Sequence, residues 1–180
     1  ASNSFLATKI SFVNEIANMS NVWGIDFQEV ADGMGLDSRI SSVFLRAGAG
    51  FGGSCFPKDV KALAAAAKNS KVESLMLKAT LEVNDLQPKL IVKMTEERLG
   101  VIKGKDIAVL GLAFKPDTDD VREIRSEIVI KDLIEKGANV TAHDPEGMTN
   151  FRKIVDIPMT ATPELATEKD DCVIIMTEWE

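Results

Sequence analysis

Histidine and cysteine are scarce in this chain, and each scarcity argues against a class of site. The single histidine, His143, precedes Asp144 and Pro145, and the sequence has no nucleophile elbow. A Ser–His–Asp hydrolase is therefore not expected, and His143 is predicted to be structural. The same shortage of ligands argues against a zinc site. The two cysteines, Cys55 and Cys172, lie far apart, which predicts reduced thiols in a cytoplasmic protein rather than a disulfide framework.

Basic charge and membrane-length hydrophobic runs are also lacking. The 21 Lys and Arg residues are outnumbered by 28 Asp and Glu residues, so no basic excess exists to neutralise the phosphates of a nucleic acid. No apolar run approaches the ~20 residues of a membrane span, and the first residues do not resemble a signal peptide. What is present is a hydrophobic content of 45% in 180 residues, enough for one large domain or two small ones.

The first hundred residues carry a helical pattern throughout. Apolar side chains recur at helical spacing from Phe5 to Val22, and Asn3 stands at an N-cap or first-turn position. Further helices are expected at Phe27–Met34, Ser38–Leu45, Pro57–Ala67 and Glu73–Leu99, the last with a kink or break at Pro88.

The pattern changes at Gly104 to strands that alternate with helices. Strands are expected at Asp106–Leu112, Asn139–His143 and Asp171–Thr177, and a helix at Ser126–Lys136 with Gly137 as its C-cap. Such alternation is typical of parallel βαβ units. We therefore predict a mixed fold: an all-α domain over residues 1–102, then a truncated Rossmann-like α/β domain with a parallel sheet over residues 103–180, with the boundary at residues 100–105.

A glycine-rich loop interrupts the helices. Gly48, Gly50 and Gly53 match the G-x-G-x-x-G pattern, but no strand precedes them and no βαβ unit surrounds them. The context therefore disfavours a dinucleotide fingerprint. The loop can still let backbone N–H groups approach a ligand such as a pyrophosphate.

Cys55 follows this loop directly and lies just ahead of a predicted helix N-terminus. The helix dipole and the nearby Lys58 both favour the thiolate, which is the reactive form. The alternative is that Cys55 is a small buried hydrophobic residue. Asp59, four residues later, can position water or act as a base, or it can be an ordinary first-turn acid.

A second candidate segment runs from Gly111 to Glu123, at the carboxyl end of the first predicted strand. Ligands bind at this end of the strands in open α/β sheets. Lys115 and Arg122 are the expected anion ligands there. The alternative is a solvated charged loop, because Asp117, Asp119 and Asp120 outnumber the two cations.

Three blocks of residues resemble the UDP-glucose dehydrogenases, members of the UDP-glucose/GDP-mannose dehydrogenase family. Asn3 to Glu15 is similar to the start of their central helix, Gly50 to Asp59 to their catalytic-cysteine motif, and Gly111 to Arg122 to their nucleotide-binding loop. The blocks occur in the family's order, and the resemblance runs through the whole chain.

The resemblance implies an NAD-dependent oxidation of the C6 hydroxyl of UDP-glucose to the carboxylate, through a thiohemiacetal and a thioester on a cysteine. It assigns the nucleophile to Cys55, water activation and proton transfer to Asp59, and oxyanion stabilisation to Asn3. It assigns NAD contacts to Lys58 and Arg122, and nucleotide-phosphate contact to Lys115. The remaining implied substrate contacts are Arg39 (toward a neighbouring subunit), Phe44, Arg46, Ala47, Gly48, Ala49, Gly50, Phe51 and Gly52.

The resemblance also implies that this chain is part of a longer enzyme. The family's catalytic lysine would lie two positions before Ala1, its NAD-binding domain would precede that lysine, and a further substrate-binding arginine would follow Trp179. The chain alone is therefore expected to be inactive, and its helical domain to form a homodimer or a higher homo-oligomer. Alternatives are a dehydrogenase for UDP-N-acetylmannosamine or GDP-mannose, or a non-catalytic module that dimerises and binds a nucleotide sugar.

Overall fold

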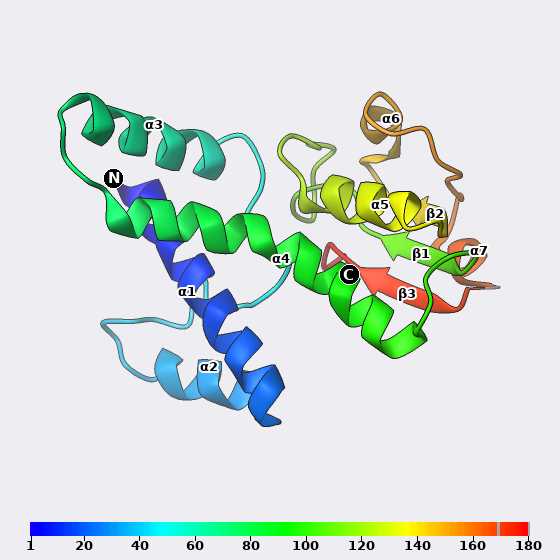
Figure 1. The fold of residues 1–180 in the computed structure, drawn as a ribbon, viewed down its shortest axis with the longest axis horizontal. Coiled ribbons are helices and arrows are strands. Elements are labelled where there is room, and N and C mark those ends of the chain that lie inside the picture. The colour runs from blue at the N-terminus through cyan, green and yellow to red at the C-terminus, as the bar shows by residue number, and fades with distance from the viewer. Residues whose placement is uncertain (169, 180) are drawn as a thin grey trace. The chain divides into compact units, whose positions relative to one another are not determined.

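The computed structural model describes residues 1–168 and 170–179, which fold into two compact units (Figure 1). The first unit comprises Ala1–Phe51 and Cys55–Gln87, and the second comprises Gly52–Ser54 and Pro88–Glu180. Among the described residues, no helix is both long enough and apolar enough to cross a membrane.

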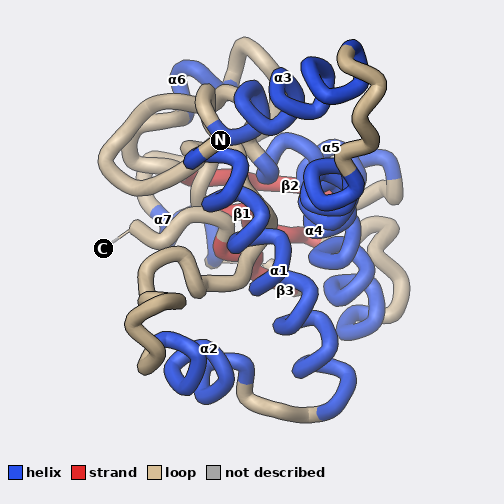
Figure 2. Tube along the Cα trace, turned by 90° about the vertical axis from the view of Figure 1, so that its left-hand side faces the viewer, coloured by secondary structure: helices blue, strands red, loops and turns tan. Residues whose placement is uncertain are grey.

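The first unit contains helices and loops, as the sequence predicts (Figure 2). Its helices are α1 (Ser2–Trp23), α2 (Phe27–Gly35), α3 (Phe56–Asn69) and the first half of α4 (Leu75–Leu99). Gly24 ends α1 in the left-handed conformation, with φ of 67°. Pro57 stands in the first turn of α3, where its missing N–H costs no hydrogen bond.

The helix predicted at Ser38–Leu45 does not form, and this prediction is wrong. The segment is a series of turns in which Ser41 and Phe44 have positive φ values of 64°. Lys9 of α1 explains the difference, because its ammonium donates hydrogen bonds to the carbonyl oxygens of Ile40 at 2.7 Å, Ser41 at 3.1 Å and Val43 at 2.5 Å. A cation that gathers three carbonyl groups holds the backbone in a turn.

Polar side chains lie between α1 and α4 in the first unit. The hydroxyl groups of Thr8 and Thr80 are 3.0 Å apart, and Ser11 donates to the carbonyl oxygen of Thr80 at 2.8 Å. Asn14 on α1 and Asn84 on α4 are each only 1% exposed. Buried polar groups are stable when they are hydrogen-bonded, so the hydrogen bonds of Thr8 and Ser11 to Thr80 form a polar seam that fixes the pairing of the two helices more specifically than apolar contacts alone.

The second unit is built around a parallel three-stranded sheet. Its strands are β1 (Asp106–Leu110), β2 (Asn139–His143) and β3 (Cys172–Ile175), in the order β2-β1-β3. The three predicted strands are confirmed, and so is the helix between the first two, α5 (Arg125–Glu135). Gly137 follows the end of α5 with φ of 86°, as a helix-terminating glycine does.

Two short helices connect the later strands. They are α6 (Met148–Phe151) and α7 (Pro163–Thr167), and the second was not predicted. The sequence does carry a start signal for α7, because the Thr162 hydroxyl accepts a hydrogen bond from the N–H of Leu165 and a proline follows at the first helical position.

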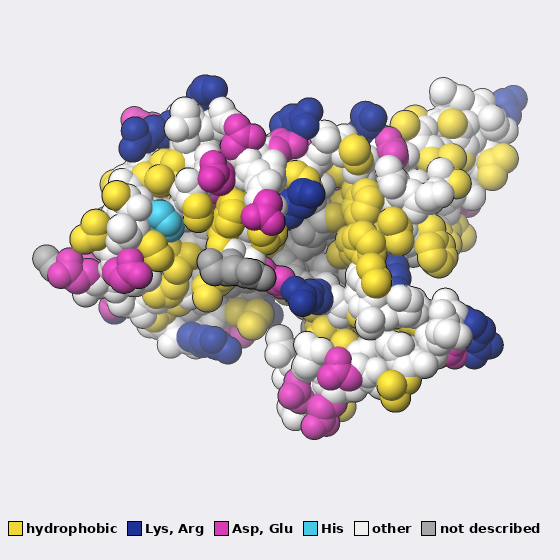
Figure 3. Space-filling model, turned by 180° about the vertical axis from the view of Figure 1, so that it is seen from behind, with side chains coloured by type: hydrophobic (Ala, Val, Ile, Leu, Met, Phe, Trp, Pro, Cys, Tyr) yellow, Lys and Arg dark blue, Asp and Glu magenta, His cyan; other side chains and the backbone are white. Residues whose placement is uncertain are grey.

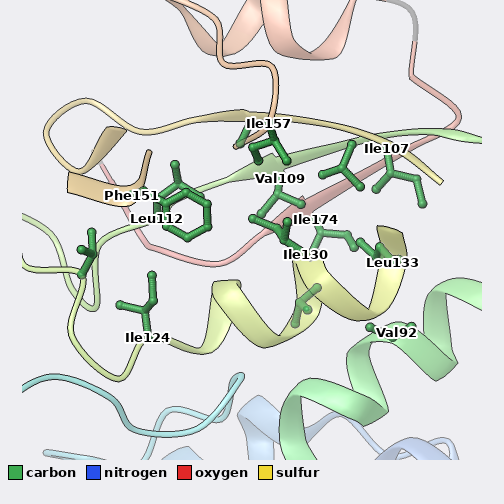
Figure 4. Close-up of a cluster of buried hydrophobic side chains, with 14 of the residues drawn as sticks. Val92, Ile107, Val109, Leu112, Ile124, Ile130, Leu133, Phe151, Ile157 and Ile174 are labelled. Carbon is green, nitrogen blue, oxygen red and sulfur yellow. The ribbon is translucent and has the colours of Figure 1, made fainter. Parts of the chain in front are cut away.

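The core of the second unit lies between its sheet and two helices. Figure 4 shows Ile130 and Leu133 of α5 and Val92 of α4 pointing toward Val109 and Ile174 of the sheet. All of these side chains are at most 8% exposed. The second half of α4 therefore packs with the sheet. Pro88 lies inside this continuous helix at the limit between the two units, while residues 100–105 mark the change from helices to strands.

A buried carboxylate organises the loops that follow the strands. Asp144, directly after β2, is 0% exposed and accepts hydrogen bonds from the N–H groups of Leu112 at 2.6 Å and Ala113 at 2.9 Å. The N–H groups of Glu146 and Gly147 and the indole of Trp179 donate to it as well. Burial acts to raise the pKa of Asp144, but the hydrogen bonds outweigh burial and hold that pKa below its usual value.

We predict that Asp144→Asn destabilises the second unit by about 2–4 kcal/mol, because several buried N–H groups lose a charged acceptor. Since the folded pKa is lowered, the contribution of this carboxylate is present above its unfolded pKa and is lost as pH falls through the folded value. Urea unfolding at neutral and acid pH measures both effects. The exposed Asp156→Asn is the control; equal losses in the two variants would contradict the prediction.

Candidate active site

Asn3 and Asp59, two of the three predicted catalytic residues, form a direct hydrogen bond. The Asn3 amide Nδ2 donates to Asp59 Oδ2 at 2.7 Å, and the Lys58 ammonium lies 3.5 Å from Asp59 Oδ1. The Asn3 amide, and to a smaller extent Lys58, hold the pKa of Asp59 below its usual value against the opposing effect of desolvation. The pair therefore presents an ionised carboxylate that can accept a proton or orient water.

Cys55 occupies the N-cap position of α3, one helical turn from Asp59. Its side chain is exposed, so the alternative of a buried hydrophobic cysteine is excluded for this residue. The N–H of Asp59 donates to the carbonyl oxygen of Cys55 at 2.9 Å, which fixes the turn that relates the two. An accessible thiol at a helix N-terminus with a carboxylate in the next turn is an arrangement suited to nucleophilic catalysis.

Two buried asparagines hold the first half of the glycine loop. Asn14 Oδ1 accepts the N–H of Gly48 at 2.7 Å. Asn84 pairs with both backbone groups of Phe51: its Oδ1 accepts the Phe51 N–H at 2.7 Å and its Nδ2 donates to the Phe51 carbonyl at 3.1 Å. The N–H groups of Gly48 and Phe51 are thus already engaged within the protein, so any backbone contact with a pyrophosphate falls to other residues of the loop.

Gly50 is required by this pairing. Its φ is 97°, and a Cβ atom there would stand 2.4 Å from Asn84 Oδ1. Any other residue would meet both backbone strain and a collision with the amide. The glycine therefore serves close backbone approach to α4, a use different from the dinucleotide fingerprint that the spacing of Gly48, Gly50 and Gly53 imitates.

Three aromatic rings connect the loop to the start of α3. The ring of Phe56, the residue after Cys55, lies 6.1 Å from the ring of Phe51 in an edge-on arrangement and 6.0 Å from the ring of Phe44. Phe51 is only 5% exposed and belongs to the core of the first unit, whereas Phe44 is 39% exposed. Of these two predicted substrate contacts, Phe44 is therefore the one whose ring is open to a ligand.

The other predicted substrate residues of the first unit lie at its surface. Arg39 is paired with Asp37 at 2.5 Å, and its side chain is 88% exposed. Arg46 and Gly48 are exposed as well, while Ala47 and Ala49 are half-buried. The exposed Arg39 guanidinium agrees with the expected reach toward another subunit, which stays a prediction.

In the second unit, Gly52 and Gly53 lie against the loop that follows β1. The N–H of Gly53 donates to the carbonyl oxygen of Arg122 at 2.9 Å, and a Cβ at Gly52 would come within 2.5 Å of the carbonyl oxygen of Glu123. The resemblance assigns Gly52 to the substrate and Arg122 to the cofactor, and the structure places their two segments in contact within this unit.

The two predicted cations of the loop after β1 have different surroundings. The guanidinium of Arg122 forms two hydrogen bonds to Asp120, at 2.9 and 2.7 Å. That pairing is the main reason why the pKa of Asp120 is lowered. Lys115 is exposed, and its ammonium lies 5.7 Å from the centre of the Phe114 ring. Both cations are accessible to an anionic ligand, although Arg122 would have to share its charge with Asp120.

Four residues that hold loops within one unit or the other were not predicted from the sequence: Lys9, Asn14 and Asn84 in the first unit and Asp144 in the second. A signal existed for the first helix, because Ser4, Ser11 and Asn14 recur at helical spacing and are at most 3% exposed. A polar stripe on a helix is normally interpreted as a solvated face, and only the fold reveals that Ser11 hydrogen-bonds to α4 and that Asn14 hydrogen-bonds to the glycine loop. No group of three or more His, Cys, Asp or Glu side chains in the described part of the chain could hold a metal ion.

Comparison with known proteins identifies both parts of the chain. Residues 1–86 match the central domain of the UDP-glucose/GDP-mannose dehydrogenase family, and residues 108–180 match the UDP binding domain of the same family. The UDP-glucose 6-dehydrogenase AglM of Haloferax volcanii is 45% identical over 181 residues, an alignment that covers 100% of this chain and 42% of the relative.

Solved structures agree with these matches. A UDP-glucose dehydrogenase from Pyrobaculum islandicum superposes with a TM-score of 0.96 at 44% identity, over 99% of this chain and 42% of that chain. An NDP-N-acetyl-D-galactosaminuronic acid dehydrogenase from Methanosarcina mazei Go1 has a TM-score of 0.85 at 28% identity, over 99% of this chain and 39% of that one. The chain thus spans about two fifths of the length of these relatives.

We predict that iodoacetamide modifies Cys55 well before Cys172 in the folded chain at neutral pH. Cys55 is exposed at a helix N-terminus. Cys172 is half-buried in β3, and desolvation is the main reason why its pKa is raised. Peptide mass mapping after limited alkylation measures the order. Equal labelling, or earlier labelling of Cys172, would remove the physical case for Cys55 as an activated nucleophile.

Proposed function

Because this chain belongs to the UDP-glucose/GDP-mannose dehydrogenase family, we propose that it forms part of an NAD-dependent enzyme that oxidises the C6 hydroxyl of UDP-glucose to the carboxylate. The observation that carries the proposal is the exposed Cys55, one helical turn from an ionised Asp59 that is hydrogen-bonded to Asn3. UDP-glucose is favoured over other nucleotide sugars because identity is 44–45% to proteins named for UDP-glucose and 28% to the N-acetylgalactosaminuronic acid enzyme.

The chemistry of this chain centres on a covalent bond to Cys55. The thiolate attacks C6 of the aldehyde formed by the first oxidation, and the carbonyl oxygen takes up a proton to give a thiohemiacetal. NAD, when bound, supplies the oxidant by accepting a hydride in each of the two oxidations. The product of the second oxidation is a thioester, whose carbonyl carbon then reacts with water, so that the C–S bond breaks and Cys55 is regenerated.

Asp59 and Asn3 serve the formation and hydrolysis of these intermediates. Asp59 is ionised in the folded protein, so it can orient the attacking water and accept its proton. The Asn3 amide carries two N–H donors, of which one is engaged by Asp59. The second can donate to the oxyanion that develops on the sugar carbonyl oxygen. The hydrogen bond between the two residues thus holds the amide in the orientation that oxyanion binding requires.

The surrounding residues supply binding. Phe44 and the loop from Arg46 to Gly52 wrap the sugar and diphosphate, Lys115 binds the nucleotide phosphate, and Arg39 reaches the substrate of a neighbouring subunit. Lys58 and Arg122 fit a role at the phosphates of NAD, because their side chains are 72% and 68% exposed and both are cations.

A homodimer is the proposed assembly, with the first unit at the interface. Phe5, Phe12 and Met19 lie seven residues apart on α1 and are 72%, 49% and 37% exposed. Residues at this spacing share one face of a helix. Hydrophobic side chains gather into patches on the surface of the molecule, as Figure 3 shows. An exposed hydrophobic stripe of this kind is typical of a surface that another protein chain covers.

We predict that the chain is dimeric by light scattering at tens of micromolar, and that Phe12→Glu weakens the dimer at least about tenfold, since it places a charge in an apolar contact. Val101→Glu, at an exposed apolar residue of the second unit, is the matched control and should leave the dimer intact. A purely monomeric wild-type chain, or equal effects of the two variants, would contradict the assignment.

We predict that the 180-residue chain alone forms no NADH from UDP-glucose, whereas a complete enzyme that contains it does. In that enzyme, Cys55→Ser should lower kcat by more than about a thousandfold, because the covalent route is lost. Cys172→Ala should leave kcat within about twofold, since Cys172 lies in β3. NADH absorbance measures all three. NADH formed by the isolated chain, or a fully active Cys55→Ser enzyme, would refute the proposal.

A further inference from the structure

The hydrogen bonds of Asn84 reach the backbone of the chain just ahead of Cys55. Asn84 stands on α4, is 1% exposed, and satisfies both the N–H and the carbonyl of Phe51. An asparagine amide can donate and accept at once, so it reproduces the two-point pairing that a neighbouring strand would give. A helix thereby fixes the orientation of one peptide unit in a loop that has no regular structure.

Aromatic packing connects the fixed backbone of Phe51 to the nucleophile Cys55. The ring of Phe51 meets the ring of Phe56 at 6.1 Å, and Phe56 is bonded to Cys55. Phe51 also packs in the same buried cluster as Ala7 and Val60, so its side chain has little freedom once its backbone is held. Gly50 completes the arrangement, because only a residue without Cβ brings the loop this close to Asn84.

We propose that Asn84 is a positioning residue of the active site: through Phe51 and Phe56 it sets the place of Cys55 and of the loop that would bind the sugar diphosphate. The proposal rests on the proposed function for its substrate but not for its geometry. Loss of the Asn84 amide is therefore expected to increase the mobility of residues 46–56 and to weaken ligand binding, and to affect the rest of the fold less.

Hydrogen exchange of the folded 180-residue chain tests the geometric part. Asn84→Leu has a similar volume and makes neither hydrogen bond, so the Phe51 amide should exchange at least about tenfold faster while amides of β1 and α5 keep the wild-type rate. Asn84→Asp should restore slow exchange at pH 5, because a buried carboxylic acid that is protonated both donates and accepts. If Asn84→Leu and wild type exchange alike at Phe51, the proposal is overturned.

Gly50→Ala provides a second variant that leaves α4 untouched. Its matched control is Gly24→Ala, which has a similar positive φ of 67° but no atom within 4 Å of the added Cβ. Gly50→Ala should speed exchange at Phe51 and Gly24→Ala should not, although both carry backbone strain. Equal effects would mean that strain alone, and not the Asn84 contact, controls the loop, and would overturn the proposal.

Protection of Cys55 from iodoacetamide by UDP-glucose tests the functional part. The concentration of UDP-glucose that halves the alkylation rate should rise at least about tenfold in Asn84→Leu and in Gly50→Ala, and stay unchanged in Gly24→Ala. Unchanged half-protection in Asn84→Leu, despite faster exchange at Phe51, would overturn the role of Asn84 in the active site. If UDP-glucose protects Cys55 in no form of the chain, the proposed substrate fails, and the exchange data still decide whether Asn84 positions the loop.

Discussion

The candidate site depends on the pairing between a loop backbone and two buried asparagine side chains. A segment with glycines at 48, 50, 52 and 53 has no conformation of its own, because each glycine increases the freedom that folding must remove. Asn14 and Asn84 supply the missing constraint by accepting or donating three hydrogen bonds from positions that are 99% buried. The loop is therefore ordered by helices, and Cys55 is placed at the start of α3.

The polar seam between α1 and α4 holds these two helices in a fixed register, so that they can order the loop. Thr8 and Ser11 on α1 each hydrogen-bond to Thr80 on α4, so the seam contributes specificity where a purely apolar contact could slide. The apolar residues Phe5 and Phe12 of α1 do not take part in this seam and are exposed at the surface, where the proposed second copy of the chain would cover them. In the second unit a single carboxylate, Asp144, plays the comparable part, and it gathers N–H groups from the loops that follow β1 and β2.

Much of this fold could be predicted from the sequence, and the failures have physical causes. The strands and α5 follow from apolar runs that alternate with amphipathic segments, and the motifs predict Cys55, Asp59 and Asn3 as candidate catalytic residues. The helix expected at Ser38–Leu45 fails because Lys9, thirty residues earlier or more, captures its carbonyl groups. Asn84 and Asp144 could not be assigned, since the value of a polar residue depends on the partner that folding brings to it. The Asn3–Asp59 bond likewise joins residues that only the tertiary fold makes neighbours.

We propose that Cys55 faces the reacting carbon of a nucleotide sugar. The most direct test is a crystal structure of this chain, or of an enzyme that contains it, with UDP-glucose bound. We expect C6 of the glucose to lie within about 3.5 Å of Cys55 Sγ, the separation of reacting atoms that are poised for attack, with the diphosphate along the loop from Arg46 to Gly52. A glucose whose C6 points away from Cys55, or a nucleotide bound elsewhere on the chain, would contradict it.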